Sequence, residues 1–149
     1  MDQKTRNEAF NKYIKTLFNS SNFKERAIAA QNLGELKEGR AINMLARALK
    51  SEKDDVVINH IIEAMGEIGD PKATMLIIEF LKQEVEKPEE DQDKTRLFTI
   101  IESLMKIGDK RALEHLGILL DSCHSDIRNL TEEAFECIDP EWKLNIKSV

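Results

Sequence analysis

Apolar residues recur at the spacing of an α-helix along almost the whole chain. Phe10, Ile14, Leu17 and Phe18 form one such stripe and predict a first helix over about residues 5–18. Three pairs of helical segments follow, over residues 23–36 with 40–50, 56–68 with 71–85, and about 94–107 with 110–120. A further segment that ends at Ile138 has the pattern of the first helix of a fourth pair. We therefore predict an all-α protein made of helical hairpins.

The turn inside the second pair encodes the end of one helix and the start of the next. Gly69 stands where the chain must reverse, a position that often requires a positive φ. Asp70 is expected to cap the following helix with its carboxylate, and Pro71 falls at the first helical position, where a missing N–H costs nothing. Asp139 and Pro140 repeat this pair of residues near the C-terminus. Trp142 and Leu144, which follow, are expected to fold back as a lid.

The segments that end the first helix of each pair recur at the spacing of internal repeats. Leu36, Ile68 and Ile107 occupy one column, and they are separated by 32 and 39 residues. The seven extra residues match an insertion over residues 86–92. A period in this range is typical of a solenoid of helical hairpins. Two further columns predict the core, and they consist of Ala41, Ala73 and Ala112, followed by Leu45, Ile77 and Leu116.

Composition narrows the choice of partners. Aromatic residues make up only 5% of the 149 residues, so Leu, Ile, Ala and Met must build the core. The net charge of -6 argues against a nucleic-acid or anionic-membrane surface. No apolar run approaches the ~20 residues of a membrane span, and the polar start carries no signal peptide, so we expect a cytoplasmic protein. Cys123 and Cys137 lack zinc-site spacing and fit reduced thiols.

The repeated motifs resemble the HEAT-like repeat of the phycobilisome-lyase type. Its pattern R-x-x-A-A-x-x-L-G is matched over residues 26–34, and its Ile-Gly-Asp turn is matched at residues 68–70 and 107–109. The chain departs from the pattern at Ile58 and Leu97, the counterparts of Arg26, and where Lys37 and Glu38 replace Gly-Asp. The resemblance implies a right-handed α-solenoid of about three to four HEAT-like hairpins.

The resemblance covers roughly residues 23–140 and implies a single domain over residues 1–149. We expect an N-terminal capping helix within residues 1–22, because the end of a repeat array needs a cover. The parts that follow are three repeats over residues 23–50, 55–85 and 93–121, and a partial repeat over 125–149. Small stand-alone proteins of this type look like protein-interaction modules.

The best binding candidate is the outward stripe of the second helices, which line the concave face in stacked hairpins. Its residues are Arg40, Asn43, Arg47, Lys72, Met75, Glu79, Arg111, Glu114 and Ile118. Arg40, Lys72 and Arg111 form a column of cations, while Met75 and Ile118 are apolar where water is expected. The alternative is that Asp70 and Asp109 neutralise the cations and that the face is merely solvated.

Enzymatic alternatives rest on weaker signals. This fold resembles the deoxyhypusine hydroxylases, which bind two irons through His-Glu pairs. In this chain the order is reversed at Glu114-His115, and neither His60 nor His124 has an adjacent Glu. We therefore expect neither a metal nor another cofactor. A Cys123-His124 thiolate pair is disfavoured because adjacent helical residues do not face each other. The acidic segment over residues 84–93 is either a docking loop or a solvated one.

These observations favour a non-catalytic protein–protein interaction scaffold or adaptor that binds a protein partner through its concave face. The alternative is an enzyme or enzyme subunit related to bilin lyases or to deoxyhypusine-hydroxylase-like proteins. Neither nucleic acid nor a membrane is expected as a partner. The sequence specifies neither the identity of the partner nor an oligomeric state.

Overall fold

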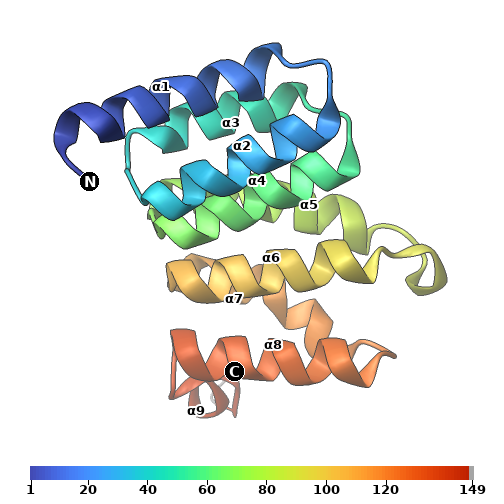
Figure 1. Ribbon diagram of the computed structural model, residues 1–149. Coiled ribbons are helices and arrows are strands. Elements are labelled where there is room, and N and C mark those ends of the chain that lie inside the picture. The colour runs from blue at the N-terminus through green and yellow to red at the C-terminus, as the bar shows by residue number, and fades with distance from the viewer. Residues whose placement is uncertain (148–149) are drawn as a thin grey trace. The chain divides into compact units, whose positions relative to one another are not determined.

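A computed structural model describes residues 1–147, which form nine α-helices and four short 3-10 helices joined by turns (Figure 1). The described residues contain no strand, so the predicted all-α class is confirmed. The chain divides into two compact units, one over Met1–Ala73 and one from Thr74 onward. The expectation of one continuous domain over residues 1–149 stays a prediction.

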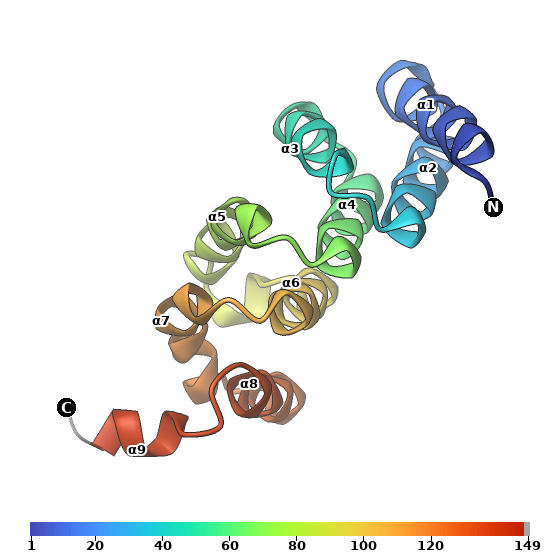
Figure 2. The ribbon, with the colours of Figure 1, turned by 90° about the vertical axis from the view of Figure 1, so that its left-hand side faces the viewer.

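The first unit places one helix between two neighbours. Helix α2 packs against both α1 and α4, and α3 packs against α4 while also contacting α1 (Figure 2). The elements of this unit are α1 (Gln3–Asn19), α2 (Phe23–Leu36), α3 (Ala41–Ser51), α4 (Asp55–Ile68) and the 3-10 helix η1 (Pro71–Ala73). The predicted capping helix is therefore present, and it covers one side of α2 in this unit.

A glycine brings α2 and α4 unusually close together. A Cβ atom placed on Gly34 would lie 2.8 Å from the Cα of Ala64, a separation that real side chains do not tolerate. Ala30, one turn earlier in α2, is fully buried. Small residues at this crossing let the two backbones approach, which is the physical reason for the Ala and Gly positions of the repeat motif.

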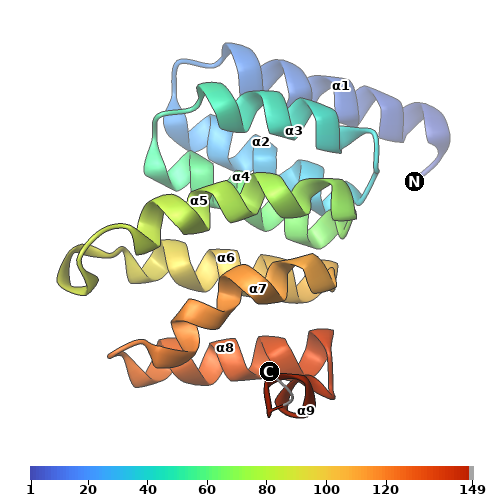
Figure 3. The ribbon, with the colours of Figure 1, turned by 180° about the vertical axis from the view of Figure 1, so that it is seen from behind.

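In the second unit, α6 packs against α5 on one side and α8 on the other. Figure 3 shows α5 and α7 in front of α6. The elements are α5 (Thr74–Val85), η2 (Glu89–Asp91), α6 (Lys94–Ile107), η3 (Lys110–Ala112), α7 (Leu113–Leu116), η4 (Gly117–Asp121), α8 (Ser125–Ile138) and α9 (Trp142–Lys147).

The turns that end the first helices have the predicted geometry. Gly69 and Gly108 adopt φ values of 77° and 74°. Asp70 accepts a hydrogen bond from the N–H of Lys72 at 2.9 Å, which confirms that it caps the chain that follows. In the first turn of the array the corresponding position is held by Lys37, which takes the left-handed conformation with φ 52°.

A second kind of hydrogen bond, which the repeat motifs do not predict, holds the start of the first helix in each pair. In each case a side chain at the end of the preceding element accepts the backbone N–H of the residue that caps the helix. The four pairs are Ser20 with Asn22 at 3.1 Å, Glu52 with Asp54 at 3.2 Å, Glu84 with Asp93 at 2.7 Å, and Ser122 with His124 at 3.1 Å. The chain thereby satisfies a donor that a helix terminus would otherwise leave open.

The predicted core columns are confirmed. The second helix of the third pair, however, differs from its prediction. The three alanines and the Leu45, Ile77 and Leu116 column are all 0% exposed. The helix predicted over residues 110–120 is instead three short pieces, with a regular α-helix only over Leu113–Leu116. Gly117 follows directly and has low helix propensity, which accounts for the change to a 3-10 helix at that point.

Two local expectations need correction. Trp142 is buried and its ring lies 4.9 Å from that of Phe135, but Leu144 is 67% exposed and does not act as a lid. Glu84, expected within an acidic segment that is solvated or docks a partner, is only 4% exposed. Its carboxylate also accepts from Nζ of Lys87 at 3.1 Å, so it fastens the base of the insertion.

Candidate functional site

All nine residues of the predicted binding stripe are exposed to solvent. Four of them belong to the first unit, namely Arg40, Asn43, Arg47 and Lys72. The other five belong to the second unit, namely Met75, Glu79, Arg111, Glu114 and Ile118.

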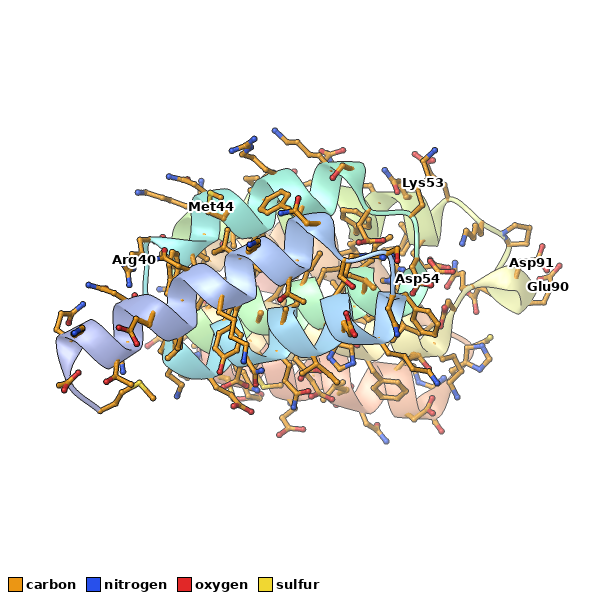
Figure 4. All side chains as sticks on the ribbon, turned by 45° about the horizontal axis from the view of Figure 1, so that its top comes forward. Arg40, Met44, Lys53, Asp54, Glu90 and Asp91 are labelled. Carbon is orange, nitrogen blue, oxygen red and sulfur yellow. The ribbon has the colours of Figure 1, made fainter. Side chains whose placement is uncertain are left out.

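In the first unit, Arg40 lies at the start of α3, and its side chain contacts several groups of its own unit. Its Nε donates to Glu38, its Nη2 donates to Asn7 Oδ1 at 2.7 Å, and its guanidinium lies 4.0 Å from the centre of the Phe10 ring. Figure 4 shows Arg40 and Met44 on the N-terminal half of α3. Arg40 thus ties α3 to α1, and much of its charge is satisfied internally.

The other polar side chains of the predicted stripe in the first unit are more available to a partner than Arg40 is. Asn43, Arg47 and Lys50 follow one another at helical spacing and are all exposed. The guanidinium of Arg47 lies 5.7 Å from the centre of the Phe18 ring. Lys72 is exposed too, and the bond that joins it to Asp70 uses its backbone N–H and not its ammonium group. Asp70 caps the turn in the structure, and its neutralisation of Lys72 stays a prediction.

In the second unit, Arg111 is held by Asp109, which confirms the neutralising role predicted for that carboxylate. The Nη2 atom of Arg111 lies 2.6 Å from Oδ2 of Asp109, and Nε donates to the same oxygen at 3.0 Å. The hydrogen bonds from Arg111 lower the pKa of Asp109 from 3.8 to about 2. The two residues stand two positions apart within a single turn.

Met75 and Ile118 are 39% and 57% exposed, but they do not form one apolar patch around the end of α5. Ile118 lines a small cavity of about 120 Å³ together with Val85 and Lys87. Met75 stands ten residues before Val85 in α5, roughly 15 Å along the axis at 1.5 Å per residue. The two side chains would therefore contact different parts of a partner.

The histidines and Cys123 do not form a catalytic arrangement. His60, His115 and His124 are half-buried, and the part of the chain that the structure describes holds no group of three or more metal-ligating residues. Cys123 is exposed, and its backbone N–H donates to Glu89 at 2.9 Å. The Glu89 carboxylate beside the thiol raises its pKa, which makes a nucleophilic thiolate less available.

A groove in the second unit was not predicted as a site. It has a volume of about 560 Å³, and Leu113, Leu120, Phe135 and Trp142 supply its apolar lining. We refer to it as the Trp142 groove. Glu114 is the one lining residue that also belongs to the predicted stripe. The sequence signal for this groove is the apolar Trp142 after the last Asp-Pro turn, for which the sequence predicts a lid.

The described residues thus define an all-α protein built from repeated helical hairpins with exposed second helices. The family model for HEAT repeats matches residues 11–89, which is more than half of the chain, and the chain belongs to this family. The phycobilisome-lyase type within it stays a prediction. A search of curated proteins finds no match. Among the described helices, none is both long and apolar enough to cross a membrane.

Proposed function

We propose that the chain is a non-catalytic scaffold that binds a partner protein through the exposed faces of its second helices. HEAT repeats generally mediate protein–protein interaction, and helical repeats present extended surfaces for it. The proposal is carried by one observation: all nine stripe residues are exposed, while Leu45, Ile77 and Leu116 on the same elements are fully buried. The elements therefore have one face committed to the core and one free for a partner.

The first unit favours an acidic segment of the partner. Arg47, Lys50 and Lys72 are exposed cations, and Asn43 adds an amide that can donate and accept. Such charges raise the association rate of an oppositely charged partner more than they raise affinity. Arg40 contributes less, because Glu38 and Asn7 already receive its hydrogen bonds.

A photo-crosslinking experiment tests this proposal. A benzophenone side chain is placed at Asn43, and in a second variant at Glu79, in protein expressed in its native cell. The matched control carries the same group at Glu63. This residue is exposed on α4, which is the first helix of its pair and lies outside the proposed surface. We expect a discrete protein adduct from the Asn43 or Glu79 position and none from Glu63, with mass spectrometry identifying the partner.

Charge reversal then tests the role of the cations. Arg47→Glu combined with Lys72→Glu should weaken capture of the partner most at low salt, because screening removes the attraction at high salt. Lys12→Glu combined with Lys15→Glu, which changes the exposed side of α1, is the matched control. Adducts that form equally at Glu63, or capture that the reversal leaves unchanged, would contradict binding through the second helices.

A further inference from the structure

Among its described lining residues, the Trp142 groove shares Glu114 alone with the nine-residue surface on which the proposed function rests. Phe135 and Trp142 are 4% and 8% exposed, and their rings are tilted by 53° against each other. The indole N–H of Trp142 donates to Glu136 at 2.7 Å, which fixes the ring that lines the groove. Leu113 and Leu120 complete an apolar floor. An apolar side chain of a partner would be removed from water on this floor.

The rim of the groove is acidic. Glu114, Asp121 and Asp139 line it, and none of the described lining residues is a lysine or arginine. Oδ2 of Asp139 already accepts from Asn145 at 2.9 Å, whereas Glu114 and Asp121 are exposed. Lys143, which follows Trp142 in the chain, places its Nζ 5.6 Å from the centre of the indole ring.

The charge of the whole second unit has the same sign. Residues 74–149 carry 10 Lys and Arg against 17 Asp and Glu, whereas residues 1–73 carry 12 against 11. The acidic excess of the chain is therefore confined to the part that holds the groove. A field of this sign attracts basic segments and repels acidic ones.

We infer that the Trp142 groove binds a basic amphipathic segment of a partner protein. The segment places an apolar side chain on the floor beside Trp142 and directs guanidinium groups at Glu114 and Asp121. Arginine suits the rim better than lysine, because its planar fork pairs with carboxylates and also stacks on aromatic rings. This inference rests on the proposed protein-binding function and names the chemistry of a second contact.

The chain contains one tryptophan, so its fluorescence reports directly on the groove. The probe is a synthetic, Trp-free peptide of roughly twelve residues, enough for about three helical turns, with leucines on one face and arginines elsewhere. One control peptide has the same composition in an order that scatters the leucines. A second control replaces every arginine by glutamate. We expect the emission of Trp142 to change and saturate with the first peptide only.

Two charge-neutralising variants locate the contact. Glu114→Gln combined with Asp121→Asn removes two rim charges, and we expect about tenfold weaker binding at low salt. Glu90→Gln combined with Asp91→Asn removes the same charge from the exposed tip of the insertion (Figure 4) and should leave binding unchanged. All four residues are exposed, so both variants should fold, and circular dichroism verifies this.

Several outcomes would overturn the inference. They are a flat emission signal, equal binding of the scattered peptide, and equal weakening by the insertion variant. A change in emission with protein concentration alone would assign the groove to a second copy of the chain and would equally overturn it. None of these results affects crosslinking at Asn43, so failure of the groove and failure of the proposed function remain distinguishable.

Discussion

The guanidinium of Arg26 in α2 donates to both carboxylate oxygens of Glu52 at the end of α3, over 3.0 and 3.1 Å. Its third nitrogen donates to the carbonyl of Ser20, so one side chain joins three segments of the first unit. The side chains of Arg26 and Glu52 are only 18% and 10% exposed. Arg128 makes the equivalent bond to the carbonyl of Ser122 at 2.7 Å in the second unit.

Glu52→Gln should destabilise the first unit by about 2 kcal/mol, because hydrogen bonds to charged groups are worth more than neutral ones. Burial opposes ionisation of Glu52, but the bonds from Arg26 and Asp54 outweigh it and lower the pKa below 4.5. The contribution is therefore complete above pH 4.5 and is lost as the pH falls through the lower pKa of the folded state. Chemical denaturation at neutral and acidic pH should show the wild-type advantage shrinking at acidic pH.

Gly34→Ala should destabilise the protein by about 1–3 kcal/mol, through crowding and not through backbone strain. The new methyl group would meet the backbone of Ala64 at 2.8 Å, so α2 and α4 must move apart. Gly117→Ala is the control, because nothing lies within 4 Å of the Cβ position there. Equal effects on the thermal midpoint would show that the α2–α4 contact does not require a glycine.

Lys37→Gly should stabilise the protein by about 1 kcal/mol, because an L-residue with a side chain is strained in the left-handed region. The mirror experiment is Gly108→Ala, at a site with φ 74° and open space around the Cβ position, which should cost a similar amount. Denaturant midpoints of the two variants should move in opposite directions. A loss of stability in Lys37→Gly would mean that the lysine side chain outweighs the strain.

Asp70→Ala should cost about 1 kcal/mol, because it removes the carboxylate that accepts the N–H of Lys72. Asp91→Ala, at the exposed tip of the insertion, makes the same chemical change without a helix to cap and should be neutral. Urea denaturation of both variants provides the comparison. If they unfold alike, Asp70 does not stabilise its turn.

Glu84→Ala should destabilise the second unit by about 1–3 kcal/mol, since the N–H of Asp93 would lose its partner. Glu86→Ala changes an exposed glutamate two residues later and should have little effect. Amide hydrogen exchange at the start of α6 measures the difference locally. Unchanged protection of that helix end in Glu84→Ala would show that the bond from the Asp93 N–H to Glu84 does not stabilise the start of α6.

The helices and their turns could be predicted because their causes are local. The boundaries of α2 and α6 agree with the prediction, since apolar spacing and capping residues mark both ends. The break near Gly117 could not be predicted from the apolar pattern, because the apolar stripe continues through it. The bond between Glu84 and Asp93 could not be predicted, because the insertion separates the two residues in sequence.

The surfaces proposed for binding were only partly predictable. Helical periodicity correctly assigned the exposed side of each second helix, because burial of the opposite stripe decides it. The engagement of Arg40 with Asn7 depends on how α1 packs, which no periodicity specifies. The Trp142 groove likewise requires residues from α7, η4, α8 and α9 to meet, and only a folded unit brings them together.

The bond between Glu84 and Asp93 turns the insertion into an attachment point. The Glu84 carboxylate holds the two ends of the insertion together through its bond to the Asp93 N–H. The tip of the insertion, which includes Glu90 and Asp91, is exposed. Because the cost of closing a loop grows only with the logarithm of its length, extra residues at the tip add little. A label or even a second folded domain could be carried there while both helices keep their places.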